Sequence, residues 1–256
     1  MKYTVEPIAY IESCFPEKFG IPRQSLLCPS AVGKLILLPA FNQKEAVEGL
    51  EKVSHLWLTF IFHQHIDKQW KPKVRPPRLG GNKKIGVFAT RSSFRPNNIG
   101  LSVVKLDRIE YKSDEQKGRQ KNLQIILHLS GIDLLDGTPI VDIKPYVPYV
   151  DNVSDASNTM APNAPEVLPI IFLEAASRFL DDFNVAKDIE CADSFKKLIC
   201  EVLQQDPRPA YQEVDSKRIY SMYLYDFDIK WNYRHDEYNV LSIYVVAIEE
   251  VLFKES

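Results

Sequence analysis

The sequence predicts a mainly β fold: an antiparallel, barrel-like N-terminal domain followed by a smaller α+β domain. Three observations support this prediction. Short apolar runs recur through the first half without a long helical pattern between them, which argues against parallel βαβ winding. All ten glycines lie between Gly20 and Gly137, as is typical of tight turns between strands. Long stretches with apolar residues at helical spacing occur only in the second half.

The strands expected in the first half span residues 5–11, 34–38, 56–62, 85–89, 101–106 and 123–129. The run LWLTFIF at 56–62 is the most apolar of them and predicts a fully buried strand. Residues 45–50 predict one or two helical turns. A closed or nearly closed barrel is the simplest way to bury so many short strands.

The second half begins with a polar, turn-prone stretch over residues 151–165 that is typical of a linker or a long surface loop. We therefore place a domain boundary near residue 150, which divides the chain into 1–150 and 151–256. Helices are expected over 166–183 and 192–205, the second ending before Asp206 and Pro207. Strands over 219–227 and 240–248 complete an α+β unit.

The composition, with 45% hydrophobic and 26% charged residues, is that of an ordinary globular protein. No run of eighteen apolar residues exists, so we expect no membrane span, and the first residues lack the apolar core of a signal peptide. The cysteines form no CxxC pair, which fits a cytoplasmic location and predicts neither disulfides nor a zinc site; they are Cys14, Cys28, Cys191 and Cys200.

A basic segment interrupts the near-neutral charge balance. The net charge is −2, yet nine Lys or Arg residues and no Asp or Glu lie between Gln69 and Lys105. A cationic surface of this density predicts a phosphate-bearing partner. The alternative is a solvated basic face that acidic residues elsewhere balance.

Motifs of common nucleotide and hydrolase sites are absent: the sequence contains no GxGxxG, GxxxxGK[ST], GxSxG or HExxH. A polar loop over 86–102 instead carries Arg91 and Arg95 among Asn, Ser and Thr residues. Arginine can bind a carboxylate or phosphate with paired donors, and the smaller polar groups can bind ribose hydroxyls or base edges. The alternative is an ordinary long hairpin loop.

Two further segments carry polar groups between apolar ones. Asp133, Asp136 and Asp142 lie within ten residues, and Asp136 with Gly137 indicates a turn. His63 and His65 are expected on one face of a strand end. An H-x-H pair can begin a metal site, but no third ligand cluster follows, so a polar pocket rim is the favoured interpretation and no metal is expected.

Several long blocks, in order along nearly the whole chain, resemble the TrmO/TsaA-like tRNA methyltransferase family. These blocks are FHQ (62–64), WKPKVRPPRLGG (70–81), GVFATRSSFRPNNIGLSVV (86–104), DLLDGTPIVDIKPY (133–146), QDPRPAY (205–211) and YDFDIKW (225–231). The last two resemble the bacterial, full-length branch. The chain departs from the family's pattern at Ser93 and Asn98.

The resemblance implies a homodimeric, β-barrel enzyme that uses S-adenosylmethionine and methylates N6 of threonylcarbamoyladenosine beside the tRNA anticodon. It implies cofactor-binding roles for residues in four segments: Pro22, Arg23 and Gln24; His63 and Gln64; Arg91 and Leu101; and Asp133, Leu134, Leu135 and Asp136. It also implies that phosphate contacts and stacking hold the anticodon stem-loop, through Lys71, Lys73, Arg75, Arg78, Arg95, Arg208 and Tyr211.

The expected reaction is in-line displacement by N6, in which positioning supplies much of the catalysis. His63 and Asp136 are candidates for a base that removes the N6 proton. Two other functions remain as alternatives. A non-catalytic RNA-binding barrel would bind tRNA regardless of S-adenosylmethionine, and a nucleotide hydrolase would require a divalent metal.

Overall fold

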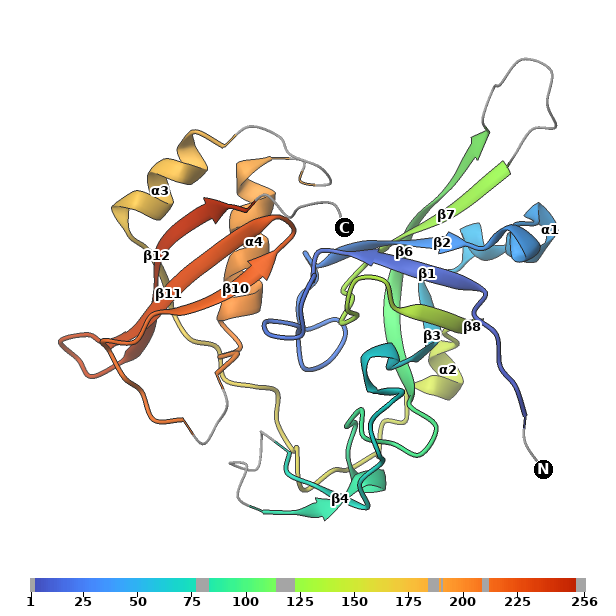
Figure 1. Cartoon of the computed structure of the whole chain (residues 1–256), viewed down its shortest axis with the longest axis horizontal. Helices are drawn as coiled ribbons and strands as arrows, with labels where there is room; N and C mark the ends of the chain where they lie inside the picture. Colours follow the sequence, from blue (N-terminus) through green and yellow to red (C-terminus); the bar gives the residue numbers. More distant parts are fainter. Residues whose placement is uncertain are drawn as a thin grey trace.

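The computed structural model describes residues 3–76, 83–113, 123–183, 189, 191–208 and 212–251. Six antiparallel strands close into a barrel in the order β1-β2-β7-β6-β3-β8 (Figure 1). Their bounds are β1 Ala9–Ser13, β2 Val32–Leu37, β3 His55–Ile61, β6 Ile99–Ser113, β7 Leu123–Ser130 and β8 Pro139–Pro145. The predicted mainly β fold with an antiparallel barrel is confirmed.

Alternating side chains fill the barrel, as the period of two along a strand requires. Leu56, Leu58 and Phe60 of β3 are buried, whereas Trp57 and Thr59 between them are half-buried. The prediction that this strand is fully buried was therefore wrong. Its apolar outer face is partly covered by neighbouring segments, for example by Tyr146, whose ring contacts that of Trp57.

Short elements lie between the barrel strands and directly after the last of them. They are the helices α1 (Lys44–Val47) and α2 (Pro148–Asp151), the 3-10 turns Pro39–Phe41, Leu50–Lys52, His63–His65 and Val87–Ala89, and the two-stranded ribbon of β4 (Lys73–Val74) with β5 (Ile85–Gly86). The strand expected over 85–89 is thus two residues long and ends in a 3-10 turn. The first strand also begins later than expected, at Ala9 rather than residue 5.

A second sheet, in the order β10-β11-β12-β9, lies beside the barrel and carries helices α3 (Glu174–Asp181) and α4 (Ala192–Leu203) (Figure 1). Its strands are β9 Ile170–Phe172, β10 Tyr220–Leu224, β11 Phe227–His235 and β12 Leu241–Glu250, with β9 parallel to β12. The helix expected over 166–183 is instead a strand followed by a shorter helix. None of the described helices is long and apolar enough to cross a membrane.

The sequence analysis missed the short strands β4 and β9 and two longer ones, β8 and β11. β8 begins and ends at a proline, and β11 alternates apolar residues with charged ones, so neither forms an apolar run. The strand expected over 219–227 ends at Leu224, because Tyr225 has a φ of 52° and turns the chain into β11.

Candidate functional site

Three connections between barrel strands meet at one end of the barrel. In this antiparallel order, β1, β3 and β7 all end where β2, β6 and β8 begin. The connections are residues 14–31, 62–98 and 131–138. This arrangement explains why segments far apart in the sequence come together: each of the three connections carries part of the predicted site.

Two adjoining cavities, of about 420 Å³ and about 220 Å³, lie at this end of the barrel. Phe60, Phe62 and Asp133 line both of them, so we treat them together as the barrel-mouth pocket. Their combined size suits a small-molecule ligand, because such sites usually measure about 300–1,000 Å³.

All but one of the predicted cofactor-binding residues line this pocket. The larger cavity is lined by Pro22, Arg23, Gln24, Arg91, Leu101 and Asp133. The smaller one is lined by His63, Gln64, Asp133, Leu134 and Leu135. Asp136 lies elsewhere: its Oδ1 accepts a hydrogen bond from the Ser13 amide at 2.8 Å, in a groove on the outside of the barrel.

Asp133 is the most unusual group in the pocket. Its Oδ1 is inaccessible to solvent and has no hydrogen-bond partner among the described residues. Burial raises the pKa of this carboxyl group, and the Ser102 hydroxyl, two backbone amides and the charge of Arg91 oppose that shift. A buried acceptor without a donor is costly, so this oxygen is suited to a donor that a ligand brings.

The two arginines of the pocket differ in what they can bind. Arg23 already donates from Nη2 to the carbonyl oxygens of Asp206, at 3.0 Å, and Arg208, at 3.2 Å. Arg91 is exposed and donates from Nη1 to Gln24 Oε1, which leaves other guanidinium donors to face the cavity. Arg91 is therefore the better candidate for binding a carboxylate.

A hydrogen-bonded chain of Lys18, His65 and Ser93 borders the smaller cavity, and no sequence motif pointed to Lys18. Lys18 Nζ lies 3.3 Å from His65 Nδ1, and Ser93 Oγ lies 3.1 Å from His65 Nε2. Because a charged lysine only donates, Nδ1 accepts and Nε2 carries the proton that is donated to Ser93. The Ser93 hydroxyl proton is then free to point toward the cavity.

The expectation that His63 and His65 share one face of a strand was wrong, because both lie in the 3-10 turn that follows β3. His65 is buried, whereas His63 is half-buried and borders the cavity. Burial, and secondarily the positive charge of Lys18, lower the pKa of His63, which favours the neutral imidazole. Among the described residues, no group of three potential metal ligands exists.

The basic segment is only partly available to a phosphate. Lys71, Lys73 and Arg75 are exposed, and Lys71 Nζ lies 4.2 Å from the centre of the Phe94 ring. Arg95 instead donates to the carbonyl oxygen of Thr90 at 2.7 Å and holds its own loop. Arg78 and Tyr211 lie outside the described residues.

Arg208 is also occupied within the protein. Its side chain is 12% exposed and forms an ion pair with Asp206 at 2.9 Å, so its guanidinium does not face solvent as a phosphate contact requires. Two exposed aromatic residues within the basic segment are better placed for stacking. Phe88 is 73% exposed and Trp70 is 45% exposed.

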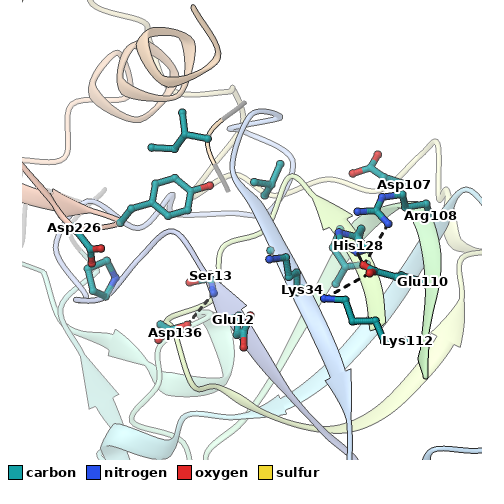
Figure 2. A pocket seen from close by; sticks show the side chains of 16 residues that line it. Glu12, Ser13, Lys34, Asp107, Arg108, Glu110, Lys112, His128, Asp136 and Asp226 are labelled. Atoms are coloured by element: carbon teal, nitrogen blue, oxygen red, sulfur yellow. Dashed lines mark hydrogen bonds and ion pairs between the residues drawn. The ribbon is translucent and has the colours of Figure 1, made fainter. Parts of the chain in front are cut away.

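A larger groove of about 820 Å³ lies on the outside of the barrel (Figure 2). Its charges contact one another: His128 Nε2 of β7 lies 2.6 Å from Glu110 Oε2 of β6, and Arg108 and Lys112 of β6 also contact Glu110. The His128 contact lowers the pKa of Glu110. Because these groups satisfy one another, we place the candidate site in the barrel-mouth pocket rather than in this groove.

Comparisons with known proteins agree over most of the chain. The model of the tRNA-methyltransferase O N-terminal domain matches residues 10–152, and that of the TrmO C-terminal domain matches residues 165–246. The tRNA (adenine(37)-N6)-methyltransferase of Escherichia coli strain K12 is 42% identical over 243 residues, which cover 94% of this chain and 97% of that protein.

Pseudomonas aeruginosa supplies two further matches. Its protein RcsF, named provisionally as an S-adenosylmethionine-dependent methyltransferase, is 50% identical over 244 residues, covering 95% of this chain and 98% of that protein. The crystal structure of TrmO from this organism superposes with a TM-score of 0.72 at 41% identity, covering 97% of this chain and 99% of that one. The chain therefore belongs to the tRNA-methyltransferase O family, as the sequence blocks predicted.

Proposed function

We propose that the protein is an S-adenosylmethionine-dependent methyltransferase that modifies N6 of adenosine 37 in tRNA. The observation that carries this proposal is the barrel-mouth pocket, which combines a carboxylate that has one buried, unpartnered oxygen with an exposed arginine beside a basic surface. Asp133 and Arg91 supply the two charges, and Lys71, Lys73 and Arg75 supply the surface. The activity is the one that the name of the Escherichia coli relative states.

The donor set of the pocket fits S-adenosylmethionine. The cofactor carries a carboxylate, which suits Arg91, and amine and hydroxyl donors, which suit the free oxygen of Asp133. Its adenine requires an apolar surface, and Phe60, Phe62 and Leu101 provide one. When bound, the cofactor supplies an electrophilic methyl group.

The residues of the chain would then bind and orient rather than react. Arg91 and Asp133 fix the ligand by charge, and the aromatic rings of the pocket exclude water. His63 is the one candidate base that lines the pocket, and its lowered pKa keeps it able to accept a proton near neutral pH. Asp136, whose carboxylate binds the Ser13 amide, is less well placed.

The finer details of the proposal rest on the family resemblance. We propose that the acceptor is threonylcarbamoyladenosine, that the protein works as a homodimer in the cytoplasm, and that residues 1–150 form the catalytic domain. Residues 151–256 would serve as the docking domain for tRNA. Of the residues expected to contact tRNA, the exposed Lys71, Lys73 and Arg75 are the ones we retain.

A methyl-transfer assay tests the function. Purified protein, S-adenosylmethionine and tRNA, with or without the threonylcarbamoyl group, are incubated, and the nucleosides are separated and identified by mass spectrometry. We expect a methyl group on N6 of adenosine 37, lost in Arg91→Ala and retained in the control Arg108→Ala, whose side chain lies on the outside of the barrel. Binding of tRNA without any methylation would favour a non-catalytic RNA-binding barrel.

A further inference from the structure

We propose that the segment Gln205–Arg208, which follows helix α4, positions the barrel-mouth pocket by holding Arg23. This inference rests on the proposed function, in that the pocket is taken to bind S-adenosylmethionine. It gives the C-terminal part of the chain a role in cofactor affinity. Asp206 is the positioning residue, because it acts on the pocket through Arg23.

The first step is the set of contacts between α4 and the 14–31 connection of the barrel. Arg23 Nη2 donates to the carbonyl oxygens of Asp206 and Arg208, at 3.0 and 3.2 Å. Gln205 Nε2 donates to the Leu27 carbonyl at 2.9 Å, and Glu201 Oε2 accepts from the Ser30 amide at 2.7 Å. The connection is thus tied to the end of α4 at three points.

The second step is that the receiving segment is itself fixed. Asp206 has a φ of 49°, a left-handed conformation that non-glycine residues adopt only where their surroundings hold them. Its Oδ1 accepts from the hydroxyl of the fully buried Tyr233 at 2.8 Å, and its Oδ2 accepts from Arg208 Nη2 at 2.9 Å. Arg208 Nη1 also donates to the Gln212 carbonyl at 2.6 Å. These contacts aim the two carbonyl oxygens at Arg23.

The third step is that packing alone does not fix the connection. A cavity of about 170 Å³ separates it from α4, lined by Pro22, Arg23, Val202, Gln205 and Pro207 among others. A segment that borders a cavity rather than a tightly packed surface can shift more easily when its hydrogen bonds are removed. Arg23 is therefore held mainly by the carbonyl oxygens of the 205–208 segment.

The last step leads into the pocket. Arg23 and its neighbour Gln24 both line the larger cavity, and Gln24 Oε1 accepts from Arg91. A path thus runs from the Tyr233 hydroxyl through Asp206, whose backbone carbonyl binds Arg23, and then along the backbone to Gln24. Gln24 contacts Arg91, the arginine that we expect to bind the carboxylate. Loosening Tyr233 or Asp206 should therefore reduce the affinity of the pocket for S-adenosylmethionine.

A double-mutant cycle tests this inference, with S-adenosylmethionine affinity measured by isothermal titration in the absence of tRNA. Asp206→Asn keeps the size and tolerates the left-handed backbone, but it leaves the largely buried Arg208 side chain without its counter-ion. We expect the Kd to rise about 5-fold in Asp206→Asn and about 10-fold in Arg23→Ala. The double variant should resemble Arg23→Ala alone, because Asp206 acts through Arg23.

Two further variants protect the test. Tyr233→Phe removes one hydroxyl and keeps the buried ring, so it loosens Asp206 with little loss of packing and should also raise the Kd. It replaces Asp206→Asn in the test if that variant does not fold. Lys230→Gln, which breaks an exposed ion pair with Glu249 in the same sheet, should leave the Kd unchanged. An unchanged Kd in Asp206→Asn would overturn the inference. So would an equal rise in Kd when Asp206→Asn is introduced into the wild type and into Arg23→Ala. A wild-type protein that binds no S-adenosylmethionine would refute the proposed function instead.

Discussion

Asp133→Asn should stabilise the ligand-free protein and lower its affinity for S-adenosylmethionine. Burial raises the Asp133 pKa above 3.8, so the folded state loses stability as pH rises through the raised pKa. A buried, unsatisfied polar group costs about 1–3 kcal/mol, and a neutral amide should recover about 1 kcal/mol of this. For a chain of this size, that gain raises the Tm by about 2–4 °C near neutral pH. The difference should disappear below pH 3.8, where both side chains are neutral.

The same substitution should cost affinity, because a hydrogen bond to a charged group contributes about 1.5–3 kcal/mol, or about 10- to 100-fold in Kd. Differential scanning fluorimetry across pH and isothermal titration with S-adenosylmethionine measure the two effects. Asp107→Asn, in an exposed ion pair with Lys105, is the matched control and should change neither. A lower Tm in Asp133→Asn, or an unchanged Kd, would refute this account of the carboxylate.

Three other substitutions test the pocket. Gly100→Ala should lower the Tm and weaken S-adenosylmethionine binding, because its Cβ would overlap the Phe60 ring that lines both cavities. The control Gly86→Ala should be neutral, since its Cβ would meet nothing within 4 Å. Equal Tm values for the two variants would contradict this. Leu101→Ala should weaken binding about 10-fold with little change in Tm, since this side chain is 53% exposed without ligand; titration and fluorimetry check both. Because the His63 pKa is lowered, its contribution to stability should be complete above pH 6.5 and be lost as pH falls through the lowered pKa. His63→Gln should therefore make the free energy of unfolding fall less steeply with decreasing pH in acid denaturation curves. An unaltered pH dependence would argue against a shifted imidazole.

The barrel and the position of the site were predictable from the sequence for one physical reason. Antiparallel strands return the chain to the same end at every second connection, so three polar segments between apolar runs had to meet there. Asp133 and Arg91 were noticed as charged residues between apolar runs, and the family resemblance implied their role in binding the cofactor. Strand β8 escaped prediction because Asp142 and its two prolines conceal the apolar residues Ile140 and Ile143.

Side-chain partners were the part that the sequence could not provide. Arg95 and Arg208 have the chemistry of phosphate ligands, and both are instead occupied within the protein, by the Thr90 carbonyl and by Asp206. Intramolecular acceptors compete with a ligand for the same donors, and only the folded chain decides between them. Lys18 was missed for the converse reason, because its position beside His65 depends on a contact across 47 residues.

The most direct test of the account is the titration of the purified protein with S-adenosylmethionine in the absence of tRNA, compared between the wild type and Arg91→Ala. The account predicts binding with a micromolar Kd, clearly weakened in Arg91→Ala. An absence of binding, both alone and in the presence of tRNA, would contradict the claim that the barrel-mouth pocket is a cofactor site.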